Sequence, residues 1–206
     1  MPDVFDKFFL DFGKKTSDFY ELKRLTPAYR VIFEDGTSID IPDSIDEIFK
    51  IFEKEEPGAG KILAKFLEDA GSNYRIAIEN LVYKPGVSPL ELVTFETIRK
   101  LRQFVVTISQ QVRKRFKNPK LIKILEFPVL FLGAKPQDTP AFYNFMNHAD
   151  FVLGTWYPMG GMYKIVEAME SLALSLGVKI HTKSNVEKIL TLDGKVQGLI
   201  VNDVSV

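Results

Sequence analysis

The sequence predicts an α+β fold that is rich in helix, and three observations support this fold class. Apolar residues recur at helical spacing over 61–83 and again over 162–176. Apolar and polar residues alternate over 29–34, as expected for a strand with one buried face. An Asp-Gly pair, a strong signal for a tight hairpin, stands at 35–36 and again at 193–194. We therefore expect long helices combined with short antiparallel hairpins.

The first forty residues combine a short helix with strands. Pro2–Phe12 places most of its aromatic residues on one side of a helix, Pro2 suits the first turn, and Gly13 is expected to end it. We expect this helix to dock against the rest of the protein. Residues 21–40 follow as strands, with a hairpin turn at Asp35-Gly36.

The middle of the chain is predicted to be mostly helical. The pattern of Ser44, Ile45, Asp46 and Glu47 is that of a capping box, which starts a helix. Proline just after a capping residue marks the start of other helices. The expected helices run from 45 to a break at Pro57-Gly58, over 61–83, from Ser88-Pro89 onward to 116, from Asn118-Pro119 onward, and over 140–148.

The stretch 156–180 organises the C-terminal part of the chain. Gly160-Gly161 leads into a helix with one apolar stripe, and Gly177 stands where a left-handed residue ends such a helix. Residues 178–180 are predicted to form a buried strand. A Gly-Gly step before a helix lets backbone approach a ligand and points N–H groups at an anion. Taken alone, however, such a step is more often a simple turn.

Composition excludes several classes of protein. Lys and Arg number 27 and so do Asp and Glu, so no nucleic-acid footprint is expected. The chain has no cysteine, which excludes disulfides and thiolate metal sites, and its two histidines make a histidine metal site improbable, so no metal is expected. No apolar run has the length of a transmembrane helix. The 17 phenylalanines supply large apolar areas for a core or for a channel that holds an apolar substrate.

The longest specific pattern is YPMGGMYKIVEAMESLALSLGVKIHTKSNVEKIL, residues 157–190. It resembles the corresponding segment of FAD-dependent carotenoid desaturases of the bacterial phytoene desaturase type, which are amine-oxidase-like flavoproteins. Residues 1–9, 20–31 and 125–161 resemble the same family in the same order, whereas 50–118 match only loosely. The resemblance implies an α+β portion of an α/β flavoprotein, with a helix-rich substrate domain over a β-sheet.

This resemblance implies a division of the chain and a cofactor. It implies a boundary helix at 1–17, a substrate-binding domain at 18–150 and part of the FAD-binding domain at 154–206. Gly160 and Gly161 would lie beside the flavin, and the backbone of Val186 would contact the FAD adenine. The family's N-terminal GxGxxG unit, which binds the pyrophosphate, is absent from this sequence. We therefore expect an internal fragment that is inactive alone and retains little or no flavin.

The resemblance also implies a reaction and its partners. The parent protein would pass a hydride from phytoene or diapophytoene to FAD, in carotenoid biosynthesis. The substrate would be an apolar polyene, and the enzyme would be cytoplasmic and peripheral to a membrane. The fragment would be prone to self-association.

Glu91 is the candidate catalytic residue. It matches a position where some members of the family carry an acidic residue near the substrate. Their basic partner, three residues further on, is replaced here by Thr94. The alternative favoured by the sequence is a carboxylate in the first turn of a helix, where the helix dipole stabilises it.

The run Arg113, Lys114 and Arg115, with Lys117 and Lys120, is the main basic cluster. A solvated helix end explains it best. Attraction to anionic lipid headgroups is the weaker alternative.

Two alternatives to the desaturase interpretation stay open. The chain could be a complete, non-enzymatic domain that binds an apolar ligand or a protein partner. It could also belong to a flavin amine oxidase-like enzyme that acts on an amine or on a retinoid-like polyene. A closed core with a filled pocket would favour the first, and assays of the parent protein would decide the second.

Overall fold

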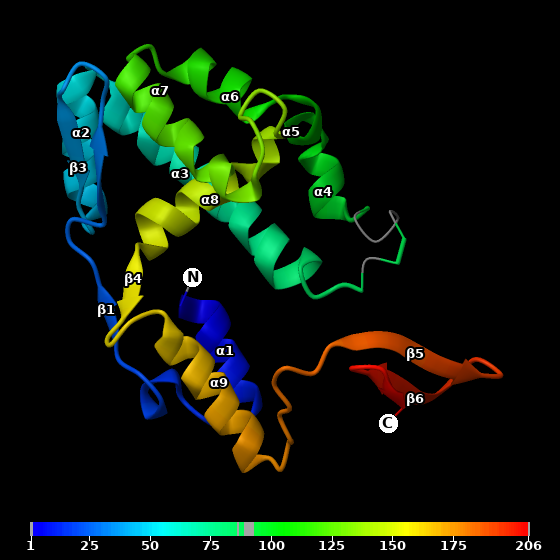
Figure 1. Ribbon diagram of the computed structural model, residues 1–206. Helices are drawn as coiled ribbons and strands as arrows, with labels where there is room; N and C mark the ends of the chain where they lie inside the picture. The colour runs from blue at the N-terminus through cyan, green and yellow to red at the C-terminus, as the bar shows by residue number, and fades with distance from the viewer. Residues whose placement is uncertain (1, 86, 89–92, 206) are drawn as a thin grey trace. The chain divides into compact units, whose positions relative to one another are not determined.

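The computed structural model describes residues 2–85, 87–88 and 93–205 (Figure 1). By its internal contacts the chain divides into two compact units, Met1–Met159 (unit 1) and Gly160–Val206 (unit 2). The assignment of 18–150 to a substrate domain and of 154–206 to an FAD domain stays a prediction.

Unit 1 is built mainly from short helices. The predicted helix at the N-terminus is present as α1, and the long predicted helix is present as α3. The α-helices are α1 (Pro2–Asp11), α2 (Ile45–Glu55), α3 (Ala59–Tyr74), α4 (Phe95–Arg99), α5 (Leu101–Val105), α6 (Ile108–Arg115), α7 (Pro119–Glu126) and α8 (Phe145–His148). The 3-10 segments are η1 (Thr16–Asp18), η4 (Phe127–Leu132) and η5 (Ala141–Asn144), and the π-helical segments are η2 (Arg75–Leu81) and η6 (Ala149–Leu153).

The strands of unit 1 form two separate antiparallel pairs. β2 (Tyr29–Ile32) pairs with β3 (Ser38–Ile41) across the predicted Asp35-Gly36 turn, so this hairpin is confirmed. Gly36 has a φ of +77°, which L side chains rarely adopt. β1 (Leu22–Arg24) does not join the hairpin but pairs with β4 (Trp156–Pro158), far away in the sequence. This long-range pairing left no local pattern in the sequence.

The core of unit 1 surrounds α3. Phe66 of α3, Phe52 of α2 and Phe116 after α6 are fully buried. The ring of Phe116 meets those of Phe52 and Phe66 edge to face, at 6.1 and 6.4 Å between centroids. The periodic apolar residues of α2, α3, α6 and α7 thus converge on one core, as their spacing predicts.

Two glycines let neighbouring helices approach α3 closely. A Cβ on Gly60 would lie 2.9 Å from the carbonyl oxygen of Phe49 in α2. A Cβ on Gly71 would lie 2.9 Å from Nδ1 of His148 in α8. Because these distances are shorter than real Cβ contacts, a side chain at either position would push α2 or α8 away from α3.

The ends of the helices test the local predictions. Asn118 accepts a hydrogen bond from the Lys120 N–H (2.8 Å) and caps α7, as expected. Ser44 is the N-cap of α2, but its side chain makes no capping hydrogen bond, so the capping-box prediction is wrong in that detail. Residues 89–92, the predicted start of another helix, lie outside the described residues, and the next helix begins at Phe95.

Unit 2 consists of one helix and a small antiparallel sheet. These elements are α9 (Tyr163–Ser175), β5 (Val186–Leu192), β6 (Lys195–Val201) and β7 (Val204–Ser205). The left-handed Gly177 (φ +81°) after α9 and the hairpin turn at Asp193-Gly194, with both φ values positive, are confirmed.

The strand predicted at 178–180 is wrong. Val178 and Ile180 are 51% and 46% exposed, and the segment has no β structure. A strand needs a neighbour that accepts its backbone hydrogen bonds. No strand in the described part of the chain pairs with this segment. Its β-branched residues alone therefore do not make it a strand.

We predict that Phe52→Ala lowers the free energy of unfolding by about 3–5 kcal/mol, because it removes a fully buried ring from the core around α3. Urea unfolding followed by circular dichroism measures the change. Phe95→Ala is the matched control, since that ring is 72% exposed and its loss is expected to have little effect. Equal losses in the two variants would contradict this description of the core.

Candidate functional site

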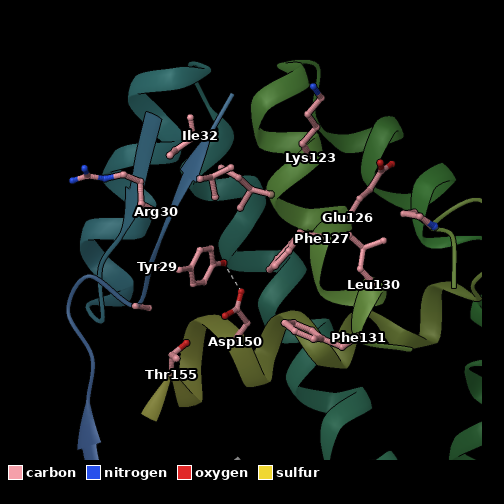
Figure 2. Close-up of a pocket in the computed structure, with 14 residues that line it drawn as sticks. Tyr29, Arg30, Ile32, Lys123, Glu126, Phe127, Leu130, Phe131, Asp150 and Thr155 are labelled. Atoms are coloured by element: carbon pink, nitrogen blue, oxygen red, sulfur yellow. Dashed lines mark hydrogen bonds between the residues drawn. The ribbon is translucent and has the colours of Figure 1, made fainter. Parts of the chain in front are cut away.

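A cleft of about 690 Å³ lies in unit 1 between the β2–β3 hairpin and the segment that continues α7 (Figure 2). Tyr29 and Ile32 of β2 line one side, and Phe127, Leu130 and Phe131 line the other. The cleft has the size and the mostly apolar lining of sites that hold small apolar molecules.

The aromatic residues of the cleft form a chain of contacts. The ring of Phe127 lies 6.0 Å from that of Tyr29 and 5.5 Å from that of Phe131. Phe131 is 74% exposed. This unusual exposure follows from Pro128: the chain leaves α7 in a 3-10 segment, η4, so Pro128 and Val129 face the core and Leu130 and Phe131 face outward.

A partly buried polar pair lies in this apolar cleft. The hydroxyl of Tyr29 donates a hydrogen bond to Oδ2 of Asp150, at 2.6 Å (Figure 2). Burial raises the pKa of Asp150 to about 6, although the hydrogen bond from Tyr29 opposes the shift. Burial and the neighbouring Asp150 also raise the pKa of the Tyr29 phenol. Asp150 therefore changes its charge close to neutral pH.

The cations at the margin of the cleft do not neutralise Asp150. Arg30 turns away from it and pairs with Asp40 on β3 (Figure 2). Lys123 approaches Glu34 at 4.0 Å. Tyr29 is accordingly the one hydrogen-bond donor to the Asp150 carboxylate among the described residues.

The predicted Gly160-Gly161 turn lies directly before α9. Both glycines have positive φ, +91° and +106°. Met162 is the N-cap of α9, and its side chain makes no capping hydrogen bond with the first turn. The backbone N–H groups of Lys164 and Ile165 already donate to the carbonyls of Gly161 and Met162, at 3.0 and 3.2 Å, but the absence of Cβ atoms at the two glycines lets a ligand approach the backbone before the helix. The turn therefore fits a role in holding a flavin cofactor.

Val186 is placed beyond the other end of α9. It is the first residue of β5, it pairs with Val201 and its side chain is exposed. Glu91, the candidate catalytic residue, lies outside the described residues. The proposed roles of Glu91, Gly160, Gly161 and Val186 stay predictions.

Sequence reasoning missed the Tyr29–Asp150 pair. In the sequence, Tyr29 is one residue of an alternating strand pattern, and Asp150 is a polar residue just after a predicted helix. The two are 121 positions apart. The only local signal was a single aspartate inside the apolar stretch 149–153.

His148 of α8 is partly buried against α3. Its ring packs over Gly71 of α3 and lies 5.4 Å from the ring of Tyr74. Burial lowers its pKa. Within residues 2–85, 87–88 and 93–205 there is no cluster of three or more potential metal ligands. None of the helices described there is long and apolar enough to cross a bilayer.

Known sequences resemble almost the whole chain. A family model for flavin containing amine oxidoreductases matches residues 11–205. The carotenoid 3,4-desaturase of Haloarcula japonica is 38% identical over 192 residues, which cover 92% of this chain and 39% of that protein. The zeta-carotene-forming phytoene desaturase of Myxococcus xanthus is 30% identical over 205 residues, 97% of this chain and 39% of that protein. The chain thus spans about two fifths of the length of these relatives.

A solved structure resembles the fold. The crystal structure of an oxidoreductase from Methanosarcina mazei matches 90% of this chain and 38% of that protein, with a TM-score of 0.51 and 23% sequence identity. Together with the helices and small sheets described above, this match supports a helix-rich α+β portion of a flavoprotein-like fold.

We predict that Asp150→Asn removes a pH-dependent contribution to stability. The folded state keeps a proton on Asp150 up to about pH 6, whereas the unfolded chain releases it near 3.8. The contribution of Asp150 is therefore complete below pH 3.8 and is lost as the pH rises to about 6. Relative to the variant, the wild type should lose up to about 3 kcal/mol over this interval.

Urea unfolding of both proteins across that pH range measures the difference. In Tyr29→Phe the donor that lowers the pKa of Asp150 is gone, so the loss should still begin near pH 3.8, where the unfolded chain releases the proton, but should end at a higher pH and be larger. Parallel stability curves for the wild type and Asp150→Asn would show that Asp150 is not buried as described.

Proposed function

The chain belongs to the flavin-containing amine oxidoreductase family, and on that basis we propose that it forms the central part of an FAD-dependent carotenoid desaturase. The observation that carries this proposal is the 38% identity to a carotenoid 3,4-desaturase over 92% of the chain. The parent enzyme would act in carotenoid biosynthesis as an oxidoreductase on an apolar polyene, phytoene or diapophytoene.

The proposed cofactor site uses backbone rather than side chains. Gly160 and Gly161 would lie beside the flavin, and the backbone of Val186 would contact the adenine. When bound, FAD supplies a two-electron acceptor that takes a hydride from the polyene. The left-handed glycines before α9 support this assignment, because a cofactor can approach backbone closely where the residue has no side chain.

The proposed substrate domain would supply apolar walls. Phe127, Leu130 and Phe131 offer apolar surface to a hydrocarbon chain, orient it and exclude water. A polyene offers few polar groups, so a site of this kind needs few polar side chains. Glu91 is the proposed acid or base near the substrate.

The proposed setting of the enzyme is the cytoplasmic surface of a membrane. A polyene dissolves in the bilayer and not in water, so the parent enzyme would associate peripherally with the membrane that stores its substrate. The chain by itself would be inactive. It would also tend to self-associate, because it exposes large apolar residues such as Leu130 and Phe131.

We predict that the isolated 206-residue chain retains little or no flavin, whereas the full-length protein that contains it retains FAD. In the full-length protein, Gly160→Ala should lower the bound flavin, because a side chain there is strained (φ +91°) and meets Lys164 at 3.1 Å. The matched control is Gly194→Ala, which is also left-handed (φ +74°) but stands in a hairpin turn with open space around it.

Flavin absorbance after gel filtration measures retention, and chromatography of polyene products after incubation with phytoene measures desaturation. Stoichiometric flavin on the isolated chain would contradict the first expectation. A full-length protein that oxidises amines but leaves phytoene and diapophytoene unchanged would overturn the proposed function.

We predict that Glu91→Gln in the full-length protein lowers the desaturation rate by about 10²–10⁴, as expected for loss of an acid or base, while the flavin content stays unchanged. Single-turnover reduction of the flavin by substrate measures the rate. If Glu91 only stabilises the first turn of a helix, the rate will equal that of the wild type and only the thermal stability will change slightly.

A further inference from the structure

Helix α5 faces the rest of unit 1 through Gln103 and Phe104. The side chain of Lys100, just before α5, donates to Asp69 of α3 at 2.6 Å, and the side-chain amide of Gln103 donates to both oxygens of Asp69 at 3.1 and 3.0 Å. Phe104 stacks on Phe142 of η5 at 4.6 Å between ring centroids. These contacts determine which side of α5 packs against α3 and η5.

The outer side of α4 and α5 carries large apolar residues among charged ones. Leu101 and Val105 of α5 are 64% and 79% exposed, and Phe95 and Ile98 of α4 are also mostly exposed. The charged residues Glu96, Arg99 and Arg102 are exposed between them. Large apolar residues that lie next to one another in water mark an interaction surface and not a random exposure.

A cationic hollow adjoins this apolar surface. Its volume is about 560 Å³, and Arg102 of α5 lines it together with Lys114 and Arg115 of α6. None of its lining residues is acidic. Arg102, Lys114 and Arg115 make no ion pair with any residue of the described ranges. Arg115 lies over the ring of Phe66, at 5.5 Å from the centroid, so Arg102 and Lys114 are the two exposed cations that the hollow presents to an anion.

The basic run 113–120 does not act as one patch. Arg113 turns to Glu126 at 3.0 Å, and Lys120 binds Asp35 at 2.9 Å on the hairpin. Only Lys114 and Arg115 remain of the first three cations, and the fold adds Arg102 to them. The sequence therefore showed a cluster of basic residues, but the structure decides which of them meet at one place.

We propose that the surface formed by Phe95, Ile98, Leu101 and Val105, together with Arg102 and Lys114, docks the protein onto an anionic lipid bilayer. This inference rests on the proposed peripheral membrane association and assigns it to a surface. The apolar side chains enter the boundary between headgroups and acyl chains, and the cations meet lipid phosphates and carboxylates. Figure 1 shows α4 and α5 following one another at the end of unit 1 away from the β2–β3 hairpin.

Charge and apolarity together favour a bilayer over other occupants. A soluble phosphate would need the cations but not the exposed leucine and valine. A second copy docked symmetrically through the same surface would bring like charges together, since Glu96 is the only carboxylate in 95–105. An anionic bilayer satisfies both the apolar residues and the positive charges.

Co-sedimentation of the full chain with vesicles tests the proposal. We expect binding to mixed phosphatidylcholine and phosphatidylserine vesicles, weaker binding to pure phosphatidylcholine, and a loss of binding as salt is raised. The double variant Arg102→Glu/Lys114→Glu should bind the anionic vesicles at least about tenfold more weakly. Its matched control is Lys54→Glu/Lys65→Glu, which makes the same change in net charge at exposed lysines of α2 and α3.

The apolar half of the surface has its own test. Val105→Ser should weaken binding to both kinds of vesicle by about threefold or more. A valine that enters the bilayer contributes to binding through its apolar area and not through charge. Val196→Ser, at a valine of β6 that is 67% exposed, is the matched control and should bind as the wild type does. Circular dichroism confirms that each variant is folded.

Several outcomes would overturn the proposal. One is a wild type that does not sediment with anionic vesicles, and another is a set of surface variants that bind as their controls do. Competition by millimolar inorganic phosphate that abolishes all binding would identify an anion site instead of a bilayer surface. A dimer in analytical ultracentrifugation that Val105→Ser dissociates would identify a protein interface. Vesicle binding needs neither flavin nor substrate, so these results are independent of whether the proposed desaturation is observed.

Discussion

The carboxylate of Asp69 on α3 is the polar contact that organises the outer helices of unit 1. It is partly buried, and burial opposes its ionisation, but hydrogen bonds from Lys100, Gln103 and Asn144 outweigh this and lower its pKa. A buried charge is tolerated only when it is paired and fully hydrogen-bonded. Asp69 therefore holds α5 and η5 in one orientation against α3. Because Gln103 faces Asp69, Leu101, Arg102 and Val105 of α5 are left facing water.

On its opposite side, α3 packs closely against α2 and α8. Gly60 and Gly71 bring α2 and α8 within a distance that no side chain would allow, and Phe66 closes the core between them. The position of α8 in turn sets η6, which follows it directly and carries Asp150. The pairing of Asp150 with Tyr29 on β2 then connects the helices to the hairpin. The apolar cleft lies where these two parts of unit 1 meet.

The two proposed ligand environments differ in kind. The glycine turn before α9 offers backbone without Cβ atoms and suits the close approach of a cofactor. The cleft and the outer side of α5 offer aliphatic and aromatic side chains and suit hydrocarbon. A desaturase of membrane-stored polyenes needs both, together with a way to reach the bilayer. The family assignment and the physical character of these surfaces are therefore consistent with one another.

The sequence by itself determined the features that depend on near neighbours. The hairpins at Asp35-Gly36 and Asp193-Gly194, the cap at Asn118 and the end of α9 at Gly177 follow from backbone conformation and from hydrogen bonds within a few residues. Only the tertiary structure decided what depends on distant partners. The stretch 178–180 has strand-like residues but no neighbouring strand, and Ser44 starts a helix without capping it through its side chain. The pairs Tyr29–Asp150, Gln103–Asp69 and Arg102–Lys114 join residues whose proximity no local pattern records, because burial and charge pairing are properties of the folded chain.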